Sequence, residues 1–210
     1  MQIKALILDL DNTIYPVPSI GEELFKPFFD VLEDSGDFEG DLKEIKQDMM
    51  RIPFQKVAEK YKFSEQLKKK GDNILQNLAY DKEIEPYEDF SMVRKLPYKR
   101  FLVTTGYEKM QQSKVKQLYL EADFEEVHVV DPSKTDKTKK DVFKSILERY
   151  NYKAAEVLVI GDDPESELKA GQELGIATVL YSREGKQSPY ATHSISRFEE
   201  LERLLQIKKV

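Results

Sequence analysis

The sequence contains no cysteine among its 210 residues. This absence excludes disulfide bonds, thiolate nucleophiles and thiolate metal sites. A chain without disulfides suits a reducing compartment, so we expect the protein to be cytoplasmic.

Long apolar runs, a targeting segment and a basic charge balance are also missing. No apolar run approaches the roughly 18 residues that a membrane-spanning helix needs. The apolar run Ile3 to Leu8 follows Met1 without the basic start and cleavage site of a signal peptide. The net charge is −6, so no overall positive field exists to attract nucleic-acid phosphates. We expect a soluble protein that binds neither membranes nor nucleic acid.

Two common catalytic motifs are absent as well, and the two histidines show no sign of a chemical role. No Gly-x-x-x-x-Gly-Lys-Ser/Thr loop or Gly-x-Ser-x-Gly elbow occurs, which disfavours P-loop nucleotide hydrolysis and serine hydrolysis. We expect His128, which lies among valines, to be a strand residue and His193 to lie in a late polar loop. We interpret both as structural residues and assign them no chemistry.

The residues that are present indicate an α/β fold. The content of 40% hydrophobic, 34% charged and 10% aromatic residues is typical of a globular chain. Apolar runs rich in valine, isoleucine and leucine predict buried strands at residues 3–8, 101–103, 127–130, 157–160 and 177–181. Segments with helical spacing lie between most of them, at residues 109–120, 140–149 and 165–174, with Gly175 as a helix C-cap. This alternation predicts a Rossmann-like parallel sheet with helices on both faces.

One long segment interrupts the alternation and predicts an inserted helical subdomain. Between Tyr15 and Phe101 no strand pattern occurs, and helices are indicated at residues 22–33, 42–50, 54–70 and 73–81. We interpret Pro16, Pro18 and Pro86 as the edges of the insert, because proline ends or redirects regular structure. We therefore expect a core domain formed by residues 1–15 and 88–210, and a helical cap subdomain formed by residues 16–87.

Acidic and hydroxyl residues follow the predicted strands, where ligands bind in open α/β sheets. They are Asp9 and Asp11, then Thr104, Thr105 and Gly106, then Asp131, and finally Gly161, Asp162 and Asp163. Asp9 and Asp11 can point to the same side of an extended chain. At about 4 Å and an effective dielectric of about 20, their repulsion amounts to roughly 4 kcal/mol, which calls for a cation, a proton or separation. Carboxylates without nearby histidine or cysteine favour Mg²⁺.

A calcium loop is the rival interpretation of the first acidic pair, and its spacing fails. The sixth position would be Ile14 where glycine is required, and the twelfth would be Ile20 where glutamate is required.

The ordered set of motifs resembles the haloacid dehalogenase superfamily of aspartate-nucleophile phosphatases over nearly the whole chain. LDLDNT resembles the first signature, which implies Asp9 as the nucleophile and Asp11 as the general acid/base. FLVTTG resembles the second, in which the Thr104 hydroxyl would hold a phosphate oxygen while Thr105 and Gly106 line the substrate pocket. By the same resemblance, the insert corresponds to a mobile cap that excludes water.

The third and fourth signatures leave alternatives open. KTKKDVF resembles the stretch that carries the family's phosphate-binding lysine, which implies a catalytic role for Lys137, with Lys134 as the alternative. VLVIGDDPESEL resembles the stretch whose first aspartate, Asp162, binds Mg²⁺. Glu167 would fill a place more often held by aspartate, and Asp163 is the alternative contact. The expected metal ligands, as a set, are Asp9, Asp11, Asp162, Asp163 and Glu167.

The resemblance implies a Mg²⁺-dependent phosphatase. Its substrate would be a small phosphorylated metabolite such as a nucleotide or a sugar phosphate, and it would react through an aspartyl phosphate on Asp9. A phosphomutase of the same superfamily shares these residues, and a non-catalytic phosphoacceptor or binding module is the other alternative. In a receiver domain the phosphorylated aspartate should follow the third strand, and an insert of this length has no place there. The oligomeric state is not predicted, although a monomer is plausible.

Overall fold

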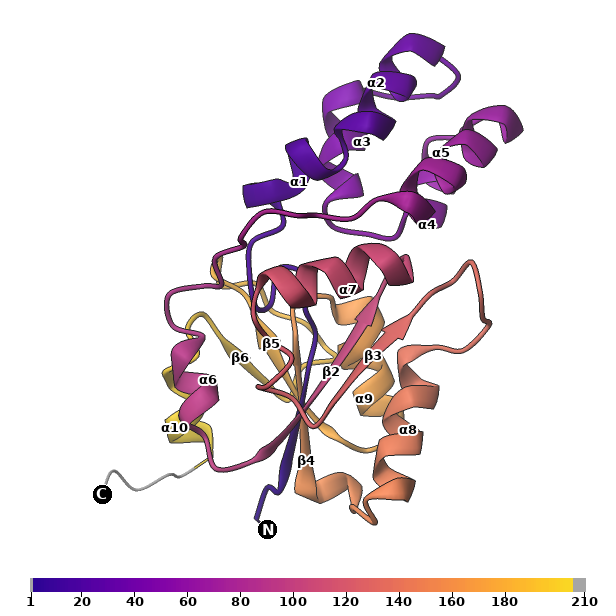
Figure 1. Cartoon of the computed structure of the whole chain (residues 1–210). Coiled ribbons are helices and arrows are strands. Elements are labelled where there is room, and N and C mark those ends of the chain that lie inside the picture. The colour runs from indigo at the N-terminus through magenta and orange to yellow at the C-terminus, as the bar shows by residue number, and fades with distance from the viewer. Residues whose placement is uncertain (1, 206–210) are drawn as a thin grey trace.

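The core of the molecule is a six-stranded parallel sheet (Figure 1). A computed structural model describes residues 2–205, so the outermost parts of the predicted core domain, residue 1 and residues 206–210, lie outside the described residues. The strand order is β3-β2-β1-β4-β5-β6. The strands are β1 (Ala5–Leu8), β2 (Lys99–Thr105), β3 (Glu126–Val130), β4 (Val157–Gly161), β5 (Ala177–Tyr181) and β6 (His193–Ile195).

Helices cover both faces of the sheet. Side chains alternate along each strand, and apolar residues on both faces pack against helices. Leu6 and Leu8 of β1 belong to a hydrophobic cluster with residues of three helices, α6 (Ser91–Lys95), α7 (Glu108–Gln117) and α10 (Glu200–Leu204). Ala5 and Ile7 belong to a second cluster with residues of α8 (Lys139–Arg149) and α9 (Lys169–Glu173). The expected α/β architecture with helices on both faces is confirmed.

Five helices lie beyond the carboxyl ends of the strands, and we call them the helical insert (Figure 1). They are α1 (Pro18–Leu24), α2 (Lys26–Ser35), α3 (Leu42–Met49), α4 (Phe54–Lys60) and α5 (Glu65–Asn77). The described termini lie toward the opposite end of the sheet (Figure 1). The helical insert therefore lies over the edge of the sheet where the acidic residues were expected.

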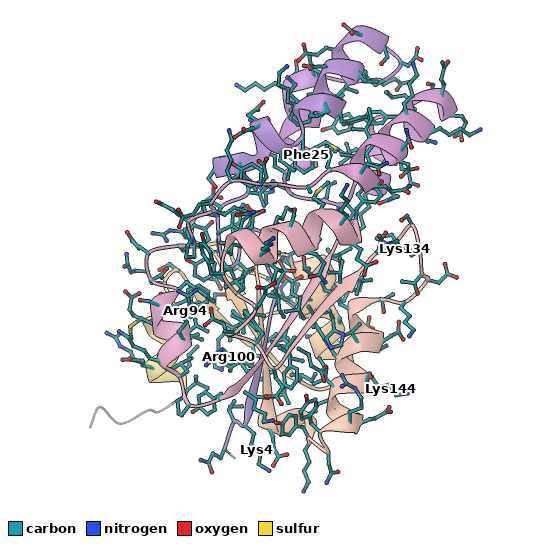
Figure 2. The ribbon with its side chains drawn as sticks, in the orientation of Figure 1. Lys4, Phe25, Arg94, Arg100, Lys134 and Lys144 are labelled. Carbon is teal, nitrogen blue, oxygen red and sulfur yellow. The ribbon has the colours of Figure 1, made fainter. Side chains whose placement is uncertain are left out.

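Aromatic rings form the interior of the helical insert. Phe28 is fully buried, and its ring lies 5.3 Å from that of Phe54 and 6.2 Å from that of Phe63, measured between centroids. The insert and one face of the sheet share a single hydrophobic cluster. Phe25, between α1 and α2, lies on the side of the insert toward the core (Figure 2). The boundaries 16–87 for a separate cap subdomain stay a prediction.

Several predicted helices have different limits in the structure. The helix expected at residues 54–70 is divided into α4 and α5, because Lys62 adopts a left-handed φ of 48° and the Ser64 side chain caps α5 by accepting from Leu67 N at 3.1 Å. The helix expected at residues 22–33 is divided at Phe25. The helix expected at residues 165–174 starts as a π-helical turn, η2 (Pro164–Leu168), and continues as α9.

Some short elements were not expected from the sequence. They are α6, α10, the 3₁₀ turn η1 (Ala154–Glu156) and the edge strand β6. His193 thus belongs to a strand and not to a loop. Gly175, with φ of 71°, takes the left-handed conformation expected of a residue that ends a helix. Within residues 2–205, no helix combines the length and apolar character required to cross a membrane.

Candidate active site

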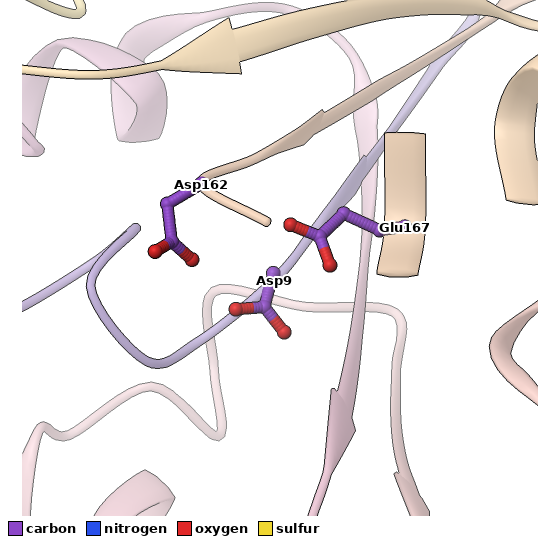
Figure 3. A group of neighbouring side chains, drawn as sticks. All are labelled: Asp9, Asp162 and Glu167. Carbon is purple, nitrogen blue, oxygen red and sulfur yellow. The ribbon is translucent and has the colours of Figure 1, made fainter. Parts of the chain in front are cut away.

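Three carboxylates meet where β1 and β4 end, and we call them the acidic cluster (Figure 3). Asp9 directly follows β1, and its backbone N–H donates to Ile160 O of β4 at 3.0 Å, which holds the two strand ends together. Asp9, Asp162 and Glu167 each offer one oxygen, and these oxygens lie within 4.8 Å of one another. Figure 3 shows the three side chains next to one another at these strand ends.

The η2 turn and a glycine bring Glu167 into the acidic cluster. Its Oε1 accepts a hydrogen bond of 2.8 Å from the backbone N–H of Asp163. A Cβ atom at Gly161 would lie 2.0 Å from that same oxygen. Glycine is therefore required at position 161 for the Glu167 carboxylate to occupy this place.

Lys139 is the cation that contacts the acidic cluster. Its buried Nζ donates to Asp9 Oδ1 at 2.6 Å and to Glu167 Oε2 at 2.8 Å. The expectation that Lys137 occupies this place is wrong, because Lys137 is exposed in the loop before α8. The alternative, Lys134, lies on the same loop (Figure 2). Its Nζ pairs with Glu108 at 2.5 Å.

The start of α8 explains the shift from Lys137 to Lys139. The Thr138 backbone N–H donates to Asp141 Oδ2 at 2.8 Å, and the Thr138 hydroxyl donates to the same atom at 2.7 Å. This capping box makes Lys139 the first residue of the helix. The pattern Thr-Lys-Lys-Asp was visible in the sequence and predicts a helix start there. The helix start alone does not show that the Lys139 side chain reaches Asp9, which depends on how α8 packs against the sheet.

Burial dominates the protonation of the acidic cluster. It raises the pKa of Asp9 to about 7, because the loss of solvent outweighs the opposing effect of Lys139, and Glu167 and Asp11 raise it further. Burial, followed by the charges of Glu167 and Asp9, also raises the pKa of Asp162 well above its usual value. Burial alone would lower the pKa of Lys139, but Asp9 and Glu167 raise it, so the lysine stays charged.

Asp11 lies in a different environment, bound by three donors. Lys114 Nζ lies 2.9 and 3.1 Å from its two oxygens, the Tyr15 hydroxyl donates to Oδ1 at 2.5 Å, and Gln111 Nε2 donates to Oδ2 at 2.8 Å. Burial would raise the pKa of Asp11, but Lys114 and these hydrogen bonds together lower it below its usual value. The two aspartates of the first signature therefore have opposite pKa shifts.

The structure does not gather all five expected metal ligands. Asp11 lies outside the acidic cluster, since its carboxylate is occupied by Lys114. Asp163 also lies outside it, and its side chain accepts from Glu165 N at 2.9 Å at the start of η2. Asp131, at the end of β3, likewise serves a helix, because its Oδ2 accepts from Glu108 N at the start of α7 at 2.9 Å.

The end of β2 supplies the hydroxyl expected at the site. Thr104 is buried, and its Oγ1 accepts a hydrogen bond of 2.6 Å from Gln111 Nε2. The Thr105 carbonyl accepts from the same nitrogen at 3.4 Å, and Gly106 has a φ of 151° that favours glycine. Gln111, Lys114 and Tyr15 were not singled out from the sequence, because a polar residue within a helix or turn pattern carries no signal of what it contacts.

A single cavity of about 110 Å³ joins these groups to the helical insert. The expected site residues on its wall are Asp9, Asp11, Thr104, Thr105, Gly106, Asp162, Asp163 and Glu167, together with Lys139. Residues 49–55 of the insert form the opposite wall, and Asn12 links the two sides by donating to Met50 O at 3.2 Å. Arg51 is exposed and lies on this wall. Lys137 is not among the residues that line the cavity.

Comparison with known proteins places this site in a family. The model of the haloacid dehalogenase-like hydrolases matches residues 6–181, which include all three residues of the acidic cluster. The chain belongs to the haloacid dehalogenase-like hydrolase family. This confirms the resemblance inferred from the four signatures.

Individual members of the family resemble the chain at low sequence identity. Glyceraldehyde 3-phosphate phosphatase of Methanopyrus kandleri is 24% identical over 203 residues, covering 86% of this chain and 84% of that protein. Two solved structures show the same fold. The HAD-hydrolase YfnB of Bacillus subtilis, bound to magnesium, has a TM-score of 0.66 at 21% identity and covers 99% of this chain and 100% of its own. A family hydrolase of Streptococcus pneumoniae has a TM-score of 0.71 at 15% identity and covers 98% of this chain and 99% of its own.

Proposed function

We propose that this protein is a Mg²⁺-dependent phosphatase that hydrolyses a small phosphorylated metabolite through an aspartyl phosphate on Asp9. One observation carries the proposal. The acidic cluster, which includes Asp9, lines the same cavity as Lys139 and Thr104. A carboxylate nucleophile, a fixed cation and a hydroxyl donor are together the groups that phosphoryl transfer requires.

The acidic cluster fits a hard divalent cation. Its donors are carboxylate oxygens alone, which suit Mg²⁺. The Asp162 side chain has neither a hydrogen-bond donor nor an ion-pair partner in the described part of the chain. Lys139 offsets one charge of the cluster, so negative charge remains for a cation to balance. Asp9, Asp162 and Glu167 would hold the ion, which when bound would neutralise charge on the phosphate group.

Asp9 and Lys139 would carry the first half of the reaction. A carboxylate oxygen of Asp9 attacks phosphorus, a new oxygen–phosphorus bond forms, and the bond from phosphorus to the alcohol oxygen breaks. Lys139 favours the ionised form of Asp9 and so opposes the effect of burial. The Thr104 hydroxyl can donate to a phosphate oxygen, since its own oxygen already accepts from Gln111.

Asp11 would move the protons. It would give a proton to the departing alcohol and later take one from the water that releases phosphate from Asp9. Its three donors favour the carboxylate form, which suits the second of these roles directly. The first role requires a proton to reach Asp11 against those contacts, so esters whose alcohols leave without a proton should react faster.

The substrate proposal is a short sugar phosphate. The Methanopyrus kandleri relative is named for glyceraldehyde 3-phosphate, and a cavity of about 110 Å³ suits a small organic group. The helical insert would act as the cap that closes over the substrate, with residues 49–55 facing the leaving group. A nucleotide monophosphate is the competing substrate class, and a cytoplasmic location stays part of the proposal.

The first test measures phosphate release from a panel of sugar phosphates, nucleotide monophosphates and 4-nitrophenyl phosphate, with added Mg²⁺ and with a chelator. We expect turnover that disappears with the chelator and returns with Mg²⁺. Asp9→Asn should abolish turnover, because an amide is too weak a nucleophile. Asp34→Asn is the control and should leave turnover unchanged, since Asp34 is exposed on α2 and does not line the cavity.

Turnover that persists in Asp9→Asn would rule out the covalent mechanism. Transfer of phosphate to a second hydroxyl of the same molecule, without release, would identify a mutase instead. Release from nucleotide monophosphates but not from sugar phosphates would overturn the substrate class alone.

A further inference from the structure

The helix α7 presents two polar side chains to Asp11 from positions one turn apart. Gln111 and Lys114 are both buried, and residues three apart on a helix lie on the same face. Lys114 Nζ reaches both Asp11 oxygens, and Gln111 Nε2 reaches Oδ2 of the same carboxylate. Neither residue belongs to the four signatures that identify the family.

Gln111 joins the two halves of the site. Its Nε2 donates to Asp11 Oδ2 at 2.8 Å and to Thr104 Oγ1 at 2.6 Å, so one amide links the carboxylate after β1 to the hydroxyl at the end of β2. The amide must face Asp11 with its nitrogen, because its oxygen would repel the carboxylate. This contact leaves the Thr104 proton free to point at a phosphate oxygen.

Lys114 is a buried charge whose side chain has Asp11 as its counterion. Its side chain is 3% exposed, whereas that of Asp11 is 25% exposed. Burying an ammonium group is costly, and a buried ion pair often stabilises a fold no better than apolar residues of the same size. Stability is therefore a poor reason for this pair, and the control of carboxylate orientation is a better one.

The rest of α7 is anchored at several points. Asp131 caps its N-terminus, Lys109 Nζ donates to Asn77 O at 2.8 Å, and the Ser113 hydroxyl accepts from Tyr80 N at 2.8 Å. A helix fixed in this way can hold a carboxylate within the few tenths of an ångström that proton transfer demands.

We propose that Lys114, with Gln111, is a positioning residue that holds the Asp11 carboxylate in line with the departing alcohol. The inference rests on the proposed function, since it assigns the means by which Asp11 meets the leaving group. Lys114 touches neither phosphate nor the reacting atoms in this proposal, and it acts only through Asp11.

The test compares two aryl esters. Phenyl phosphate needs a proton on its departing oxygen, whereas 4-nitrophenyl phosphate departs readily without one. We expect Lys114→Met to lower kcat/KM for phenyl phosphate by about 10²-fold, the lower end of what general acid catalysis provides, because the loss of orientation outweighs the easier protonation of Asp11. The value for 4-nitrophenyl phosphate should fall far less, and Lys114→Arg should recover part of the loss. Lys116→Met, an exposed lysine on the same helix, is the matched control and should leave both values unchanged.

A double variant with Asp11→Asn separates loss of the Asp11 contact from a general loss of structure. If Lys114 acts through Asp11, then adding Lys114→Met to Asp11→Asn should have no further effect on either ester. This double variant also removes the unpaired buried carboxylate that Lys114→Met alone would leave, so it remains informative if the single variant unfolds.

Three outcomes would overturn the inference. They are an equal loss for both esters, a further loss in the Asp11→Asn background, and a raised KM with unchanged kcat, the last of which would make Lys114 a phosphate ligand. The proposed function fails separately, because then the unmodified protein would release no phosphate from 4-nitrophenyl phosphate.

Discussion

At the scale of single residues, Lys139 reduces the repulsion among the carboxylates of the acidic cluster. It lies between Asp9 and Glu167 at hydrogen-bond distance from both. Removing one partner of a buried ionic group leaves uncompensated charge, which typically costs about 3–5 kcal/mol. Lys139 therefore affects both the reaction and the stability of the metal-free protein.

Lys139→Met should lower kcat/KM by about 10²- to 10³-fold, as loss of one fixed positive donor does at a site that binds an anionic transition state. It should also lower the free energy of unfolding without Mg²⁺, and added Mg²⁺ should restore part of that loss. Steady-state kinetics and urea unfolding measure the two effects. Lys137→Met should change neither quantity, because Lys137 is exposed. The reverse ranking of the two variants would return the role to Lys137.

The residue scale also shows where prediction from sequence stopped. Asp9, Thr104 and Asp162 were placed correctly at strand ends, because an apolar run followed by a polar residue marks the edge of a parallel sheet. Lys137 was wrong because the motif does not fix which lysine of KTKKDVF reaches the site, and in the structure that lysine is the first residue of α8, Lys139. Lys114 could not have been found, since contact between residues 103 positions apart depends on how α7 packs.

At the scale of elements, α5 illustrates how a missing side chain permits helix packing. A Cβ at Gly71 would lie 2.4 Å from the Phe54 ring and 2.9 Å from the Phe28 ring. Both rings are buried, so neither can move into solvent to make room for a methyl group. The glycine in the middle of α5 therefore allows the aromatic interior of the insert to reach the helix backbone.

Gly71→Ala should destabilise the protein, although alanine favours a helix over glycine by about 1 kcal/mol. Overpacking of a filled interior costs about 1–3 kcal/mol and should outweigh that gain. Thermal and urea unfolding measure the difference. Lys70→Ala, an exposed neighbour on α5, is the control and should be close to neutral. A more stable Gly71→Ala protein would mean that the rings move aside freely.

The helical insert was harder to predict than the sheet. Its helical character was evident, but the breaks at Phe25 and near Lys62 were not, because a left-handed lysine leaves no trace in an apolar pattern. The η2 turn was missed for a related reason. Its widened π-helical form places Glu167 at the site, and hydrophobic spacing alone does not separate such a turn from an ordinary helix.

At the scale of the whole molecule, the parallel sheet followed directly from the alternation of apolar runs and helical segments. Five of its six strands were expected, and the sixth, β6, is too short and too polar to stand out. The outermost strands of a sheet carry unpaired backbone groups along its edges, and charged side chains can protect these edges. At the β3 edge, Glu126 accepts from Arg149, from His128 at 2.6 Å and from the Tyr150 hydroxyl at 2.9 Å.

This edge cluster predicts how stability depends on pH. Hydrogen bonding to Arg149 is the largest cause of a pKa of about 2 for Glu126. A lowered pKa means that the carboxylate stabilises the fold above its usual pKa, near 4.5, and that this contribution is lost as pH falls toward about 2. Glu126→Gln should therefore be less stable than the unmodified protein at pH 7 and equally stable near pH 2.

Urea unfolding at several pH values measures this difference. Glu125→Gln is the control, because Glu125 has a half-exposed side chain paired with Lys99 and should matter little at any pH. A constant gap between Glu126→Gln and the unmodified protein from pH 7 to pH 2 would refute the assignment.

The contact between Gly161 and Glu167 limits how this sequence can diverge. Gly161 carries a hydrogen where every other residue carries a Cβ atom, and the Glu167 oxygen occupies the space that this Cβ would need. Any descendant that acquired a methyl group at position 161 would have to exchange the glutamate for a shorter acid or rebuild the turn that carries it. The two positions should therefore vary together or stay fixed together.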